Sequence, residues 1–487
     1  MDYRKALYYV ILTAIVLLSF FLYSSRYYPL LNSDDALNVL MAHYYQLPND
    51  FYCWGQDRGG TLIPLISQVF IKIFGCSALM AVSLSNYLLL VLGYLGLSSL
   101  IKSRYYKVIF AIIWFLPFQR FIDLTRFPIG VEYSLLGIAV FLICKIHEHS
   151  LNDGIKKHFL LVLTVLVLIL SVWVSDVSLV TIAILLFVLM LFYYVGYKSV
   201  KIDKTVVFYV IAGVVACWFF IDYAKSFVES RNARYLIVND MGKLKTAFMY
   251  LGDIFADVLF FKTGEVFVSV YTYLAIVFIV CLTVFLFRKK ARNTLIFNKW
   301  MVFFAIDTIV IFVVVMLSSW VLASHMARRY FVATYISLSM TVVLILDNLG
   351  KCSKILRYGV LVLALVGAVS PVYTMKYVNP KRLTPMADVV GEFRQLGKIG
   401  VIANYWNAYR TSCPDPDMVV ATPHDKSFVR NTKLVEMVFE RDDIYVIRDS
   451  WMPDFSDTLR QFGHILTKVG EPFVIGDCDV CKYEKTE

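Results

Sequence analysis

Charged side chains are scarce in this sequence. Only 17% of the 487 residues are Asp, Glu, Lys or Arg, whereas 59% are hydrophobic, and the mean hydropathy is +0.68. Soluble domains carry about 25% charged residues, so this composition excludes a soluble enzyme, a disordered chain and a disulfide-rich secreted scaffold. It predicts a mainly α-helical protein that crosses a membrane many times.

Negative charge is the scarcer sign. The chain has 36 acidic and 47 basic residues, which gives a formal net charge of +11. A basic excess can indicate nucleic-acid binding. Here, however, the basic residues form short clusters between apolar runs, as expected for cytoplasmic loops of a membrane protein. We therefore predict the lipid bilayer as a partner and no nucleic acid.

Long apolar runs predict about eleven transmembrane helices, because about 20 apolar residues are needed to cross the hydrocarbon layer. The third run is short for a crossing. The predicted spans are Leu7–Tyr23, Ala78–Ile101, Val108–Phe118, Ile129–Ile146, Phe159–Val174, Leu179–Val195, Val206–Ile221, Tyr271–Phe287, Trp300–Leu322, Tyr330–Leu346 and Tyr358–Pro371.

The loops between these runs predict the orientation. If about eleven spans are counted, every basic cluster falls on one face, which is expected to be cytoplasmic. The N-terminus is then cytoplasmic and the C-terminus lies outside. The clusters are Arg4 and Lys5; Lys102, Arg104 and Lys107; Lys156 and Lys157; Lys198, Lys201 and Lys204; Arg288, Lys289, Lys290 and Arg292; and Lys351, Lys354 and Arg357.

The outer face holds most of the remaining chain. We predict a transmembrane domain over residues 1–372 with two large outer loops, 26–75 and 222–270, followed by a small α/β domain over residues 373–487. The first loop contains two amphipathic runs, Ala36–Tyr45 and Thr61–Phe74, which are expected to lie along the membrane interface. The tail contains strand-like and helical segments. These are Ile399–Ala403, Met418–Ala421 and Ile444–Ile447 for strands, and Ala387–Leu396 for helix.

Cysteine and histidine do not recur at zinc-finger spacing. Cys478 and Cys481 form one Cys-x-x-Cys pair, and Cys53 and Cys413 also fall on the predicted outer face. Without a second pair a structural zinc site is incomplete. We favour disulfides in an oxidising compartment over metal binding or redox catalysis, and the pairing is left open.

The segment Asn32-Ser33-Asp34-Asp35-Ala36 places two carboxylates just after the first span. In one interpretation Ser33 or Asp34 only caps the following helix. In the other, the helix N-terminus favours the ionised carboxylate, which then acts as a general base toward a hydroxyl group. Adjacent residues do not share a helical face, so either Asp34 or Asp35 is the candidate base.

Further charged residues gather at the predicted outer ends of the spans. Arginine pairs suit a lipid phosphate, because guanidinium forms two-pronged bonds with phosphate oxygens, although they can also snorkel to head groups. Asp57 and Arg58 form a loop ion pair or line a pocket with the acid pair. Asp307 is a relay or a satisfied packing contact. The other candidates are Arg120, Asp123, Arg126, Glu132, Asp176, Arg328, Arg329 and Tyr330.

These features resemble the GT-C superfamily of integral-membrane glycosyltransferases. The matching residues are Asp34-Asp35, the loop closed by Arg58-Gly59-Gly60, and Arg328-Arg329-Tyr330-Phe331 before a late span. The segment Asn404–Arg410 is similar to that of bacterial members with an α/β tail. Size, topology and tail together look like the O-antigen glucosyltransferases of bacteria and phages that modify lipopolysaccharide.

The resemblance implies an inverting transfer of a sugar, glucose in those relatives, from a polyprenyl-phosphate donor to a glycan acceptor at the periplasmic face of a bacterial inner membrane. Asp34 or Asp35 would be the catalytic base, and Arg328, Arg329 and Arg126 would bind the donor phosphate. A monophosphate donor has no pyrophosphate to bridge, so no metal and no cofactor are expected. A flippase and a cytoplasmic-side donor synthase are implied partners.

Two other functions remain open from the sequence. A transporter or flippase for lipid-linked sugars predicts paired repeats and broken helices near the bilayer midplane, and the sequence has no convincing repeat. An O-antigen polymerase or ligase also uses polyprenyl-linked sugars. We expect it to carry basic residues in two large outer loops rather than an acidic pair directly after the first span.

Overall fold

The computed structural model describes residues 3–126, 129–148, 154–197, 203–228, 237–288, 298–349, 354–378 and 383–486. Several basic residues used to predict the orientation lie outside the described residues, as does the side chain of Arg4. They are Lys198, Lys201, Lys289, Lys290, Arg292 and Lys351.

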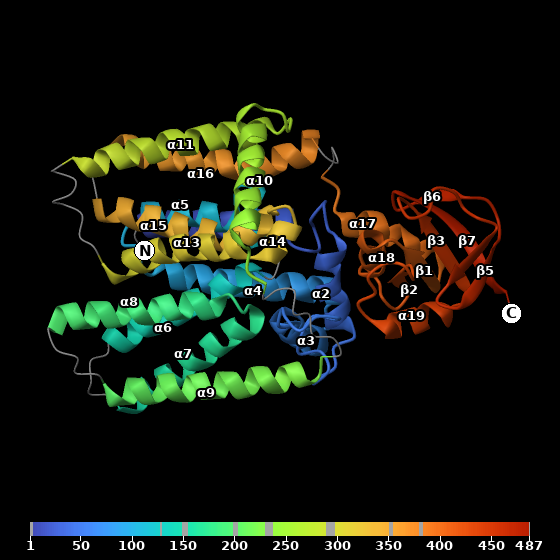
Figure 1. Ribbon diagram of the computed structural model, residues 1–487, viewed down its shortest axis with the longest axis horizontal. Helices are drawn as coiled ribbons and strands as arrows, with labels where there is room; N and C mark the ends of the chain where they lie inside the picture. Colours follow the sequence, from blue (N-terminus) through green and yellow to red (C-terminus); the bar gives the residue numbers. More distant parts are fainter. Residues whose placement is uncertain are drawn as a thin grey trace. The chain divides into compact units, whose positions relative to one another are not determined.

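Within the described residues, ten helices are long and apolar enough to cross a membrane. They follow the apolar runs of the sequence, so the predicted mainly helical membrane fold is confirmed (Figure 1). The helices are α1 (Tyr3–Tyr23), α4 (Ala78–Ser98), α6 (Ile129–Glu148), α7 (Gly154–Val174), α8 (Ser178–Tyr197), α9 (Lys204–Ser226), α11 (Val266–Phe287), α13 (Lys299–Leu317), α15 (Val332–Leu349) and α16 (Lys354–Tyr373).

The predicted third span differs from the others. Helix α5 (Arg104–Phe115) has 12 residues, which is about 18 Å at 1.5 Å per residue and too short to cross the hydrocarbon layer as a helix. It ends because Pro117 follows Leu116, and a residue before proline disfavours the helical conformation. Leu116 has φ −124° and ψ 61°. A short 3₁₀ helix, η1 (Gln119–Leu124), follows.

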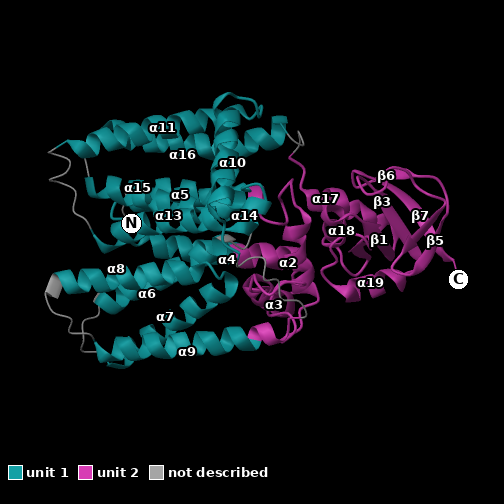
Figure 2. Cartoon of the chain, viewed as in Figure 1, with its two compact units in different colours: residues 1–19, 87–223, 232–381 teal, residues 20–86, 224–231, 382–487 magenta. Residues whose placement is uncertain are grey.

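The chain forms two compact units (Figure 2). Unit 1 comprises residues 1–19, 87–223 and 232–381 and is a bundle in which α6 packs on α7, α13 on α15 and α11 on α16. Small residues allow α4 and α6 to approach closely. A Cβ atom added to Gly96 would lie 2.0 Å from the carbonyl oxygen of Gly137, so a larger side chain there would force the helices apart. Helix α10 (Met241–Leu259) precedes α11.

Unit 2 comprises residues 20–86, 224–231 and 382–487. The loop after the first span therefore belongs to the same unit as the C-terminal α/β domain. The two amphipathic runs form helices α2 (Ser33–His43) and α3 (Leu62–Phe74). Gln68 of α3 donates a hydrogen bond of 2.7 Å to the carbonyl oxygen of Ala42 at the end of α2, which ties the two helices together.

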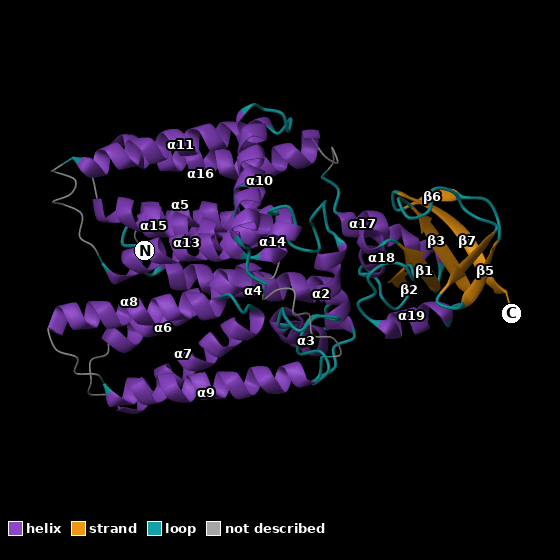
Figure 3. Cartoon of the chain, viewed as in Figure 1, coloured by secondary structure: helices purple, strands orange, loops and turns teal. Residues whose placement is uncertain are grey.

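The C-terminal domain is a seven-stranded sheet in the order β2-β1-β3-β7-β5-β4, with β6 paired to β7 (Figure 3). The three predicted strands form its parallel half, and the antiparallel half was not predicted. The strands are β1 (Ile399–Ala403), β2 (Val419–Pro423), β3 (Asp443–Arg448), β4 (Thr458–Gln461), β5 (His464–Lys468), β6 (Phe473–Ile475) and β7 (Cys478–Thr486). The helices are α17 (Met386–Val390), η5 (Gly391–Leu396), α18 (Tyr405–Ser412) and α19 (Thr432–Phe439).

The four cysteines of the predicted outer face are Cys53, Cys413, Cys478 and Cys481, and all four are free thiols in the structure. The disulfides favoured from the sequence are therefore not formed here. Cys413, Cys478 and Cys481 are buried and behave as small apolar side chains of the domain core.

Candidate functional site

The acid pair lies in the first turn of α2. Asn32 is the N-cap, and its side-chain oxygen accepts a hydrogen bond of 3.1 Å from the backbone N–H of Asp35. The sequence suggested Ser33 or Asp34 as the capping residue, but in the structure the cap is Asn32. Since the cap is supplied by another residue, both carboxylates are placed near the positive end of the helix, where negative charge is stabilised.

The two carboxylates differ in their exposure to solvent. Asp35 is buried, with 2% of its surface exposed, whereas Asp34 is half-buried. Adjacent helical residues point in different directions, and of the two only Asp34 has appreciable surface exposed to solvent. The structure therefore distinguishes two residues that the sequence left equivalent.

Tyr405 of the C-terminal domain contacts Asp34. Strand β1 ends at Ala403, and Asn404 caps α18 by accepting a hydrogen bond of 2.8 Å from the backbone N–H of Asn407. This cap fixes Tyr405 as the first residue of the helix. The Tyr405 hydroxyl donates a hydrogen bond of 2.7 Å to Oδ1 of Asp34, and α2 and α18 pack against each other.

Arg430 holds Tyr405 from the other side. Its Nε donates a hydrogen bond of 3.3 Å to the Tyr405 hydroxyl, and its guanidinium carbon lies 5.5 Å from the centre of the Tyr405 ring and 4.3 Å from that of Phe428. The backbone N–H of Arg430 donates a hydrogen bond of 2.8 Å to the Tyr409 hydroxyl. Arg430, Tyr405 and Asp34 thus form one hydrogen-bonded chain.

The electrostatic surroundings of Tyr405 and Arg430 keep both of these hydrogen-bond donors protonated. Burial raises the pKa of Tyr405, and the neighbouring Asp34 carboxylate raises it further. Burial lowers the pKa of Arg430, but Tyr405, Cys53 and Asp34 outweigh this effect and the pKa is raised overall. Tyr405 is therefore a neutral hydroxyl donor and Arg430 a cation at physiological pH.

The loop after α2 completes this cluster. The charges of Arg430, Asp34 and Arg58 all act on the Cys53 thiol, and burial raises its pKa to about 11. Gly55 has φ +66°, and a Cβ atom there would lie 3.4 Å from the carbonyl oxygen of Arg430, so the loop runs against the Arg430 backbone. Arg58 donates to Gln56 at 3.3 Å, and Asp57 is half-buried in the same loop.

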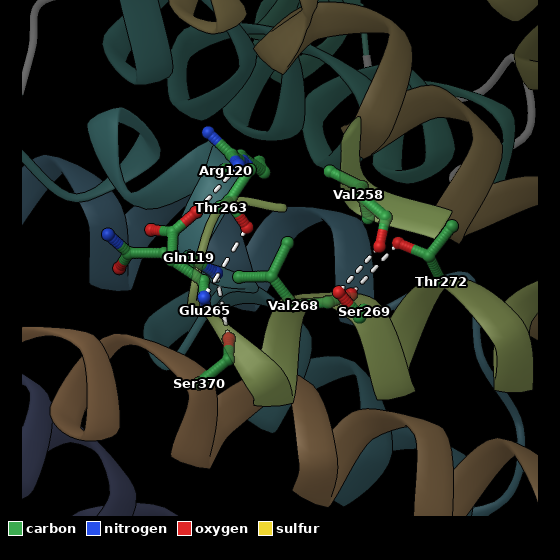
Figure 4. A network of polar contacts seen from close by, with 9 residues as sticks. All are labelled: Gln119, Arg120, Val258, Thr263, Glu265, Val268, Ser269, Thr272 and Ser370. Atoms are coloured by element: carbon green, nitrogen blue, oxygen red, sulfur yellow. Dashed lines mark hydrogen bonds and ion pairs between the residues drawn. The ribbon is translucent and has the colours of Figure 1, made fainter. Parts of the chain in front are cut away.

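The predicted arginines lie in unit 1. Arg120 of η1 forms an ion pair of 2.6 Å with Glu265, the N-cap of α11 (Figure 4). Arg328 begins the 3₁₀ helix η3 (Arg328–Phe331), where it is exposed. Burial lowers the pKa of Arg120, Glu265 raises it, and the charge of Arg328 lowers it again. Arg120 and Arg328 therefore act on each other, and Glu265 balances one of the two charges.

Arg126 is engaged differently. It forms an ion pair of 2.5 Å with Asp123, and both side chains are largely buried. Glu132 is buried on α6 and forms side-chain hydrogen bonds with Ser175 and Ser178. Asp176 lies exposed in the turn between α7 and α8.

Arg329 and Tyr330 of η3 pack on each other. The guanidinium carbon of Arg329 lies 5.2 Å from the centre of the Tyr330 ring, and the Tyr330 hydroxyl accepts a hydrogen bond of 2.7 Å from Trp320 Nε1. Of the predicted phosphate-binding arginines, Arg328 is thus the exposed one.

An apolar pocket with a volume of about 100 Å³ lies within the same unit, between α5, α11, α15 and α16. The Phe118 ring stacks on Tyr271 at 3.9 Å between ring centres, and all of the lining side chains except two tyrosines and Ser339 are apolar. Phe118 directly precedes η1, which carries Arg120. The cavity and the Arg120–Glu265 pair are therefore linked by one short segment of chain.

Metal-binding groups were also considered. In the part of the chain that the structure describes, there is no group of three or more His, Cys, Asp or Glu side chains that could hold a metal ion. The expectation that the protein requires no metal stays a prediction.

No protein-family model matches the chain, and no curated protein matches it. Among solved structures, ArnT from Cupriavidus metallidurans bound to undecaprenyl phosphate is similar with a TM-score of 0.52 and 11% identity, over 97% of this chain and 97% of ArnT. The apo structure of ArnT from the same organism is similar with a TM-score of 0.42 and 9% identity, over 98% of both chains. The oligosaccharyltransferase of Archaeoglobus fulgidus in complex with Zn and sulfate is similar with a TM-score of 0.45 and 12% identity, over 90% of this chain and 68% of the oligosaccharyltransferase. The chain is a multi-pass membrane protein with the fold of the GT-C glycosyltransferases.

Proposed function

We propose that the protein is a membrane glycosyltransferase that transfers a sugar from a polyprenyl-phosphate donor to a hydroxyl of an envelope glycan, with Asp34 as the general base. The observation that carries this proposal is the position of Asp34. It is the accessible carboxylate of the acid pair, it lies at a helix N-terminus, and its Oδ1 is held at 2.7 Å by Tyr405.

The reaction follows from this arrangement. Asp34 accepts the proton of the acceptor hydroxyl, and the hydroxyl oxygen attacks the anomeric carbon of the donor sugar. The bond from that carbon to the phosphate oxygen breaks, and polyprenyl phosphate leaves with the electron pair. A single displacement inverts the anomeric configuration. General-base catalysis of this kind contributes about 10²- to 10⁴-fold to the rate.

The donor phosphate is assigned to Arg328, with Arg329 and Arg120 adding positive charge nearby. Arg328 is exposed, and its charge acts on Arg120. Arg126 was an expected third ligand, but its ion pair with the largely buried Asp123 favours a structural role. The apolar lining of the pocket between α5, α11, α15 and α16 matches the chemistry of an isoprenoid chain, and the bound undecaprenyl phosphate of ArnT supports this donor class.

The finer assignment rests on the resemblance of the sequence. We infer glucose as the sugar, the O-antigen of lipopolysaccharide as the acceptor, and the periplasmic face of a bacterial inner membrane as the location. A flippase and a cytoplasmic-side synthase would supply the donor, because polyprenyl-linked sugars made inside must cross the bilayer to be used outside.

The test is transfer by the purified protein in liposomes. The substrates are radiolabelled polyprenyl-phosphate glucose and O-antigen lipopolysaccharide. We expect Asp34→Asn to lower the transfer rate by about 10²-fold or more, because the amide cannot accept the proton. Asp35→Asn should keep the rate within about tenfold of the wild type and lower the melting temperature, because it alters a buried group.

Asp253→Asn, a change on α10, is the control for substitution of an aspartate by its amide. Full transfer by Asp34→Asn would eliminate the proposed base. Loss of transfer in Asp35→Asn alone, with unchanged melting, would move that role to Asp35.

A further inference from the structure

The C-terminal domain reaches the acid pair through a single hydroxyl group. We propose that Tyr405, itself held by Arg430, is a positioning residue that orients the Asp34 carboxylate for proton transfer. The C-terminal domain then contributes a residue that the catalytic site needs for full activity. This inference rests on the proposed function.

The direction of the hydrogen bonds supports this role. A guanidinium group has donors only, whereas a tyrosine hydroxyl has one proton to donate and lone pairs that accept. Since Nε of Arg430 donates to the Tyr405 hydroxyl at 3.3 Å, the hydroxyl acts there as the acceptor. Its one proton is free to point at Oδ1 of Asp34, 2.7 Å away. Each hydrogen bond is therefore donated in the same direction, from Arg430 to Tyr405 and from Tyr405 to Asp34.

This hydrogen bond limits the motion of the carboxylate. The terminal torsion of an aspartate side chain is soft, so an unsupported carboxylate samples many orientations. A bond to Oδ1 fixes the plane of the group. Hydrogen bonds that orient the ligands of metal sites are worth about 10- to 100-fold in affinity or activity, and we expect a loss of similar size here.

Tyr405 is itself held in several ways. It begins a capped helix, its ring packs edge-on against Tyr409 at 5.7 Å between ring centres, and Arg430 lies against its face. A conformation fixed from three sides costs little to hold in the transition state.

Other contacts tie the domain to the first loop without Tyr405. The Tyr44 hydroxyl at the end of α2 donates a hydrogen bond of 3.1 Å to the carbonyl oxygen of Pro416. Arg26 forms an ion pair of 2.7 Å with Asp388, and the backbone N–H of Met386 donates to the carbonyl oxygen of Tyr28 at 3.2 Å. Removal of the Tyr405 hydroxyl should therefore leave the domain docked.

The experiment compares two deletions of one hydroxyl group in the full-length protein. Tyr405→Phe removes the bond to Asp34, and Tyr44→Phe removes a bond between the same two parts of the chain away from Asp34. We expect Tyr405→Phe to lower kcat by about 10- to 100-fold, with KM for the donor within about twofold and an unchanged melting temperature. Tyr44→Phe should keep the wild-type kcat.

A double-mutant cycle separates positioning from a general structural role. If Tyr405 acts through Asp34, then adding Tyr405→Phe to Asp34→Asn leaves the residual single-turnover rate unchanged, because the group to be oriented is already inactive. Effects that multiply would overturn the inference. Arg430→Gln should show the same non-additivity with a smaller loss, and it provides an independent test if Tyr405→Phe folds poorly.

The outcomes also distinguish this inference from the proposed function. If Asp34→Asn abolishes transfer while Tyr405→Phe has the wild-type kcat, Asp34 is the base and the positioning role fails. If Asp34→Asn retains full transfer, the proposed base fails, and the positioning role fails with it.

Discussion

Neighbouring residues of the acid pair have different surroundings although the sequence treats them alike. Asp35 faces the interior, where its charge acts on the buried Cys413 thiol. Asp34 faces Tyr405. A helix turns by about 100° per residue, so one position decides whether a carboxylate is buried or partly exposed. The sequence could identify the pair, but the choice within it depends on what packs against each side of α2.

The arginines of unit 1 permit a matched comparison. Arg328→Ala should raise the KM for the polyprenyl-phosphate donor by about 10- to 100-fold, because a charge-assisted hydrogen bond is worth about 1.5–3 kcal/mol, and the melting temperature should not change. Arg126→Ala should instead lower the melting temperature, since it leaves Asp123 without the partner it has in the structure and breaking a buried pair costs about 3–5 kcal/mol. The measurements are donor titrations and thermal unfolding in detergent. If Arg126→Ala raised the donor KM and Arg328→Ala only lowered the melting temperature, donor-phosphate binding would be assigned to Arg126 instead.

At the scale of helices and strands, the apolar runs located the long helices well. The helix at the third run is shorter than the run itself, because hydropathy continues through Leu116-Pro117-Phe118 while the helix stops at Phe115. In the tail, β1 and β2 are buried along their whole length, which makes them continuous apolar runs that can be recognised. Strand β4 is mostly exposed and polar, so no apolar pattern marks it.

Three helices of unit 1 meet at Asp307, which has 0% of its surface exposed. Its Oδ2 accepts hydrogen bonds of 2.5 Å from Tyr133 on α6 and from Ser337 on α15. These partners favour the packing interpretation over a relay. Asp307→Leu should destabilise the bundle by about 1–2 kcal/mol, because both hydroxyl groups lose their acceptor, whereas Asp307→Asn keeps an acceptor oxygen and should melt closer to the wild type.

Thermal unfolding in detergent and transfer by the folded fraction check this prediction. Ile311→Val, one turn further along α13, is the control for a small change at a buried position. An Asp307→Asn protein that melts normally but transfers no sugar would restore the relay interpretation.

The whole molecule constrains its own topology. Residues 20–86 and 382–487 form one compact unit, so we expect the first loop and the C-terminal domain to lie on the same side of the membrane. The chain between them must then cross an even number of times. Nine of the long apolar helices in the described residues lie in that stretch, so we predict that the segment of α5 and the residues after it supplies the tenth crossing. With α5 counted, the orientation predicted from the sequence, with every basic cluster on one face, is retained.

Alkaline-phosphatase fusions test this count, since the enzyme is active only outside the cytoplasm. A fusion after Lys102, before α5, should be inactive, and a fusion after Asp123, beyond α5, should be active. Equal activity of the two fusions would mean that α5 does not cross. A fusion after Pro29 is the positive control.

How much of the site could be predicted depends on distance along the chain. Asp34 and Arg328 became candidates because each lies at the end of an apolar run, which is a local pattern. Tyr405 entered only within a segment quoted for its resemblance, and Arg430 was not singled out at all. Tyr405 and Asp34 are 371 residues apart, and no local periodicity records which loop a surface tyrosine will meet.

That separation has a consequence for biosynthesis. As the ribosome makes this protein, Asp34 emerges 371 residues before Tyr405, the residue proposed to orient it. A nascent chain released before that point would be an inserted yet inert bundle. Full activity would begin only when the C-terminal domain has been made and α18 packs against α2.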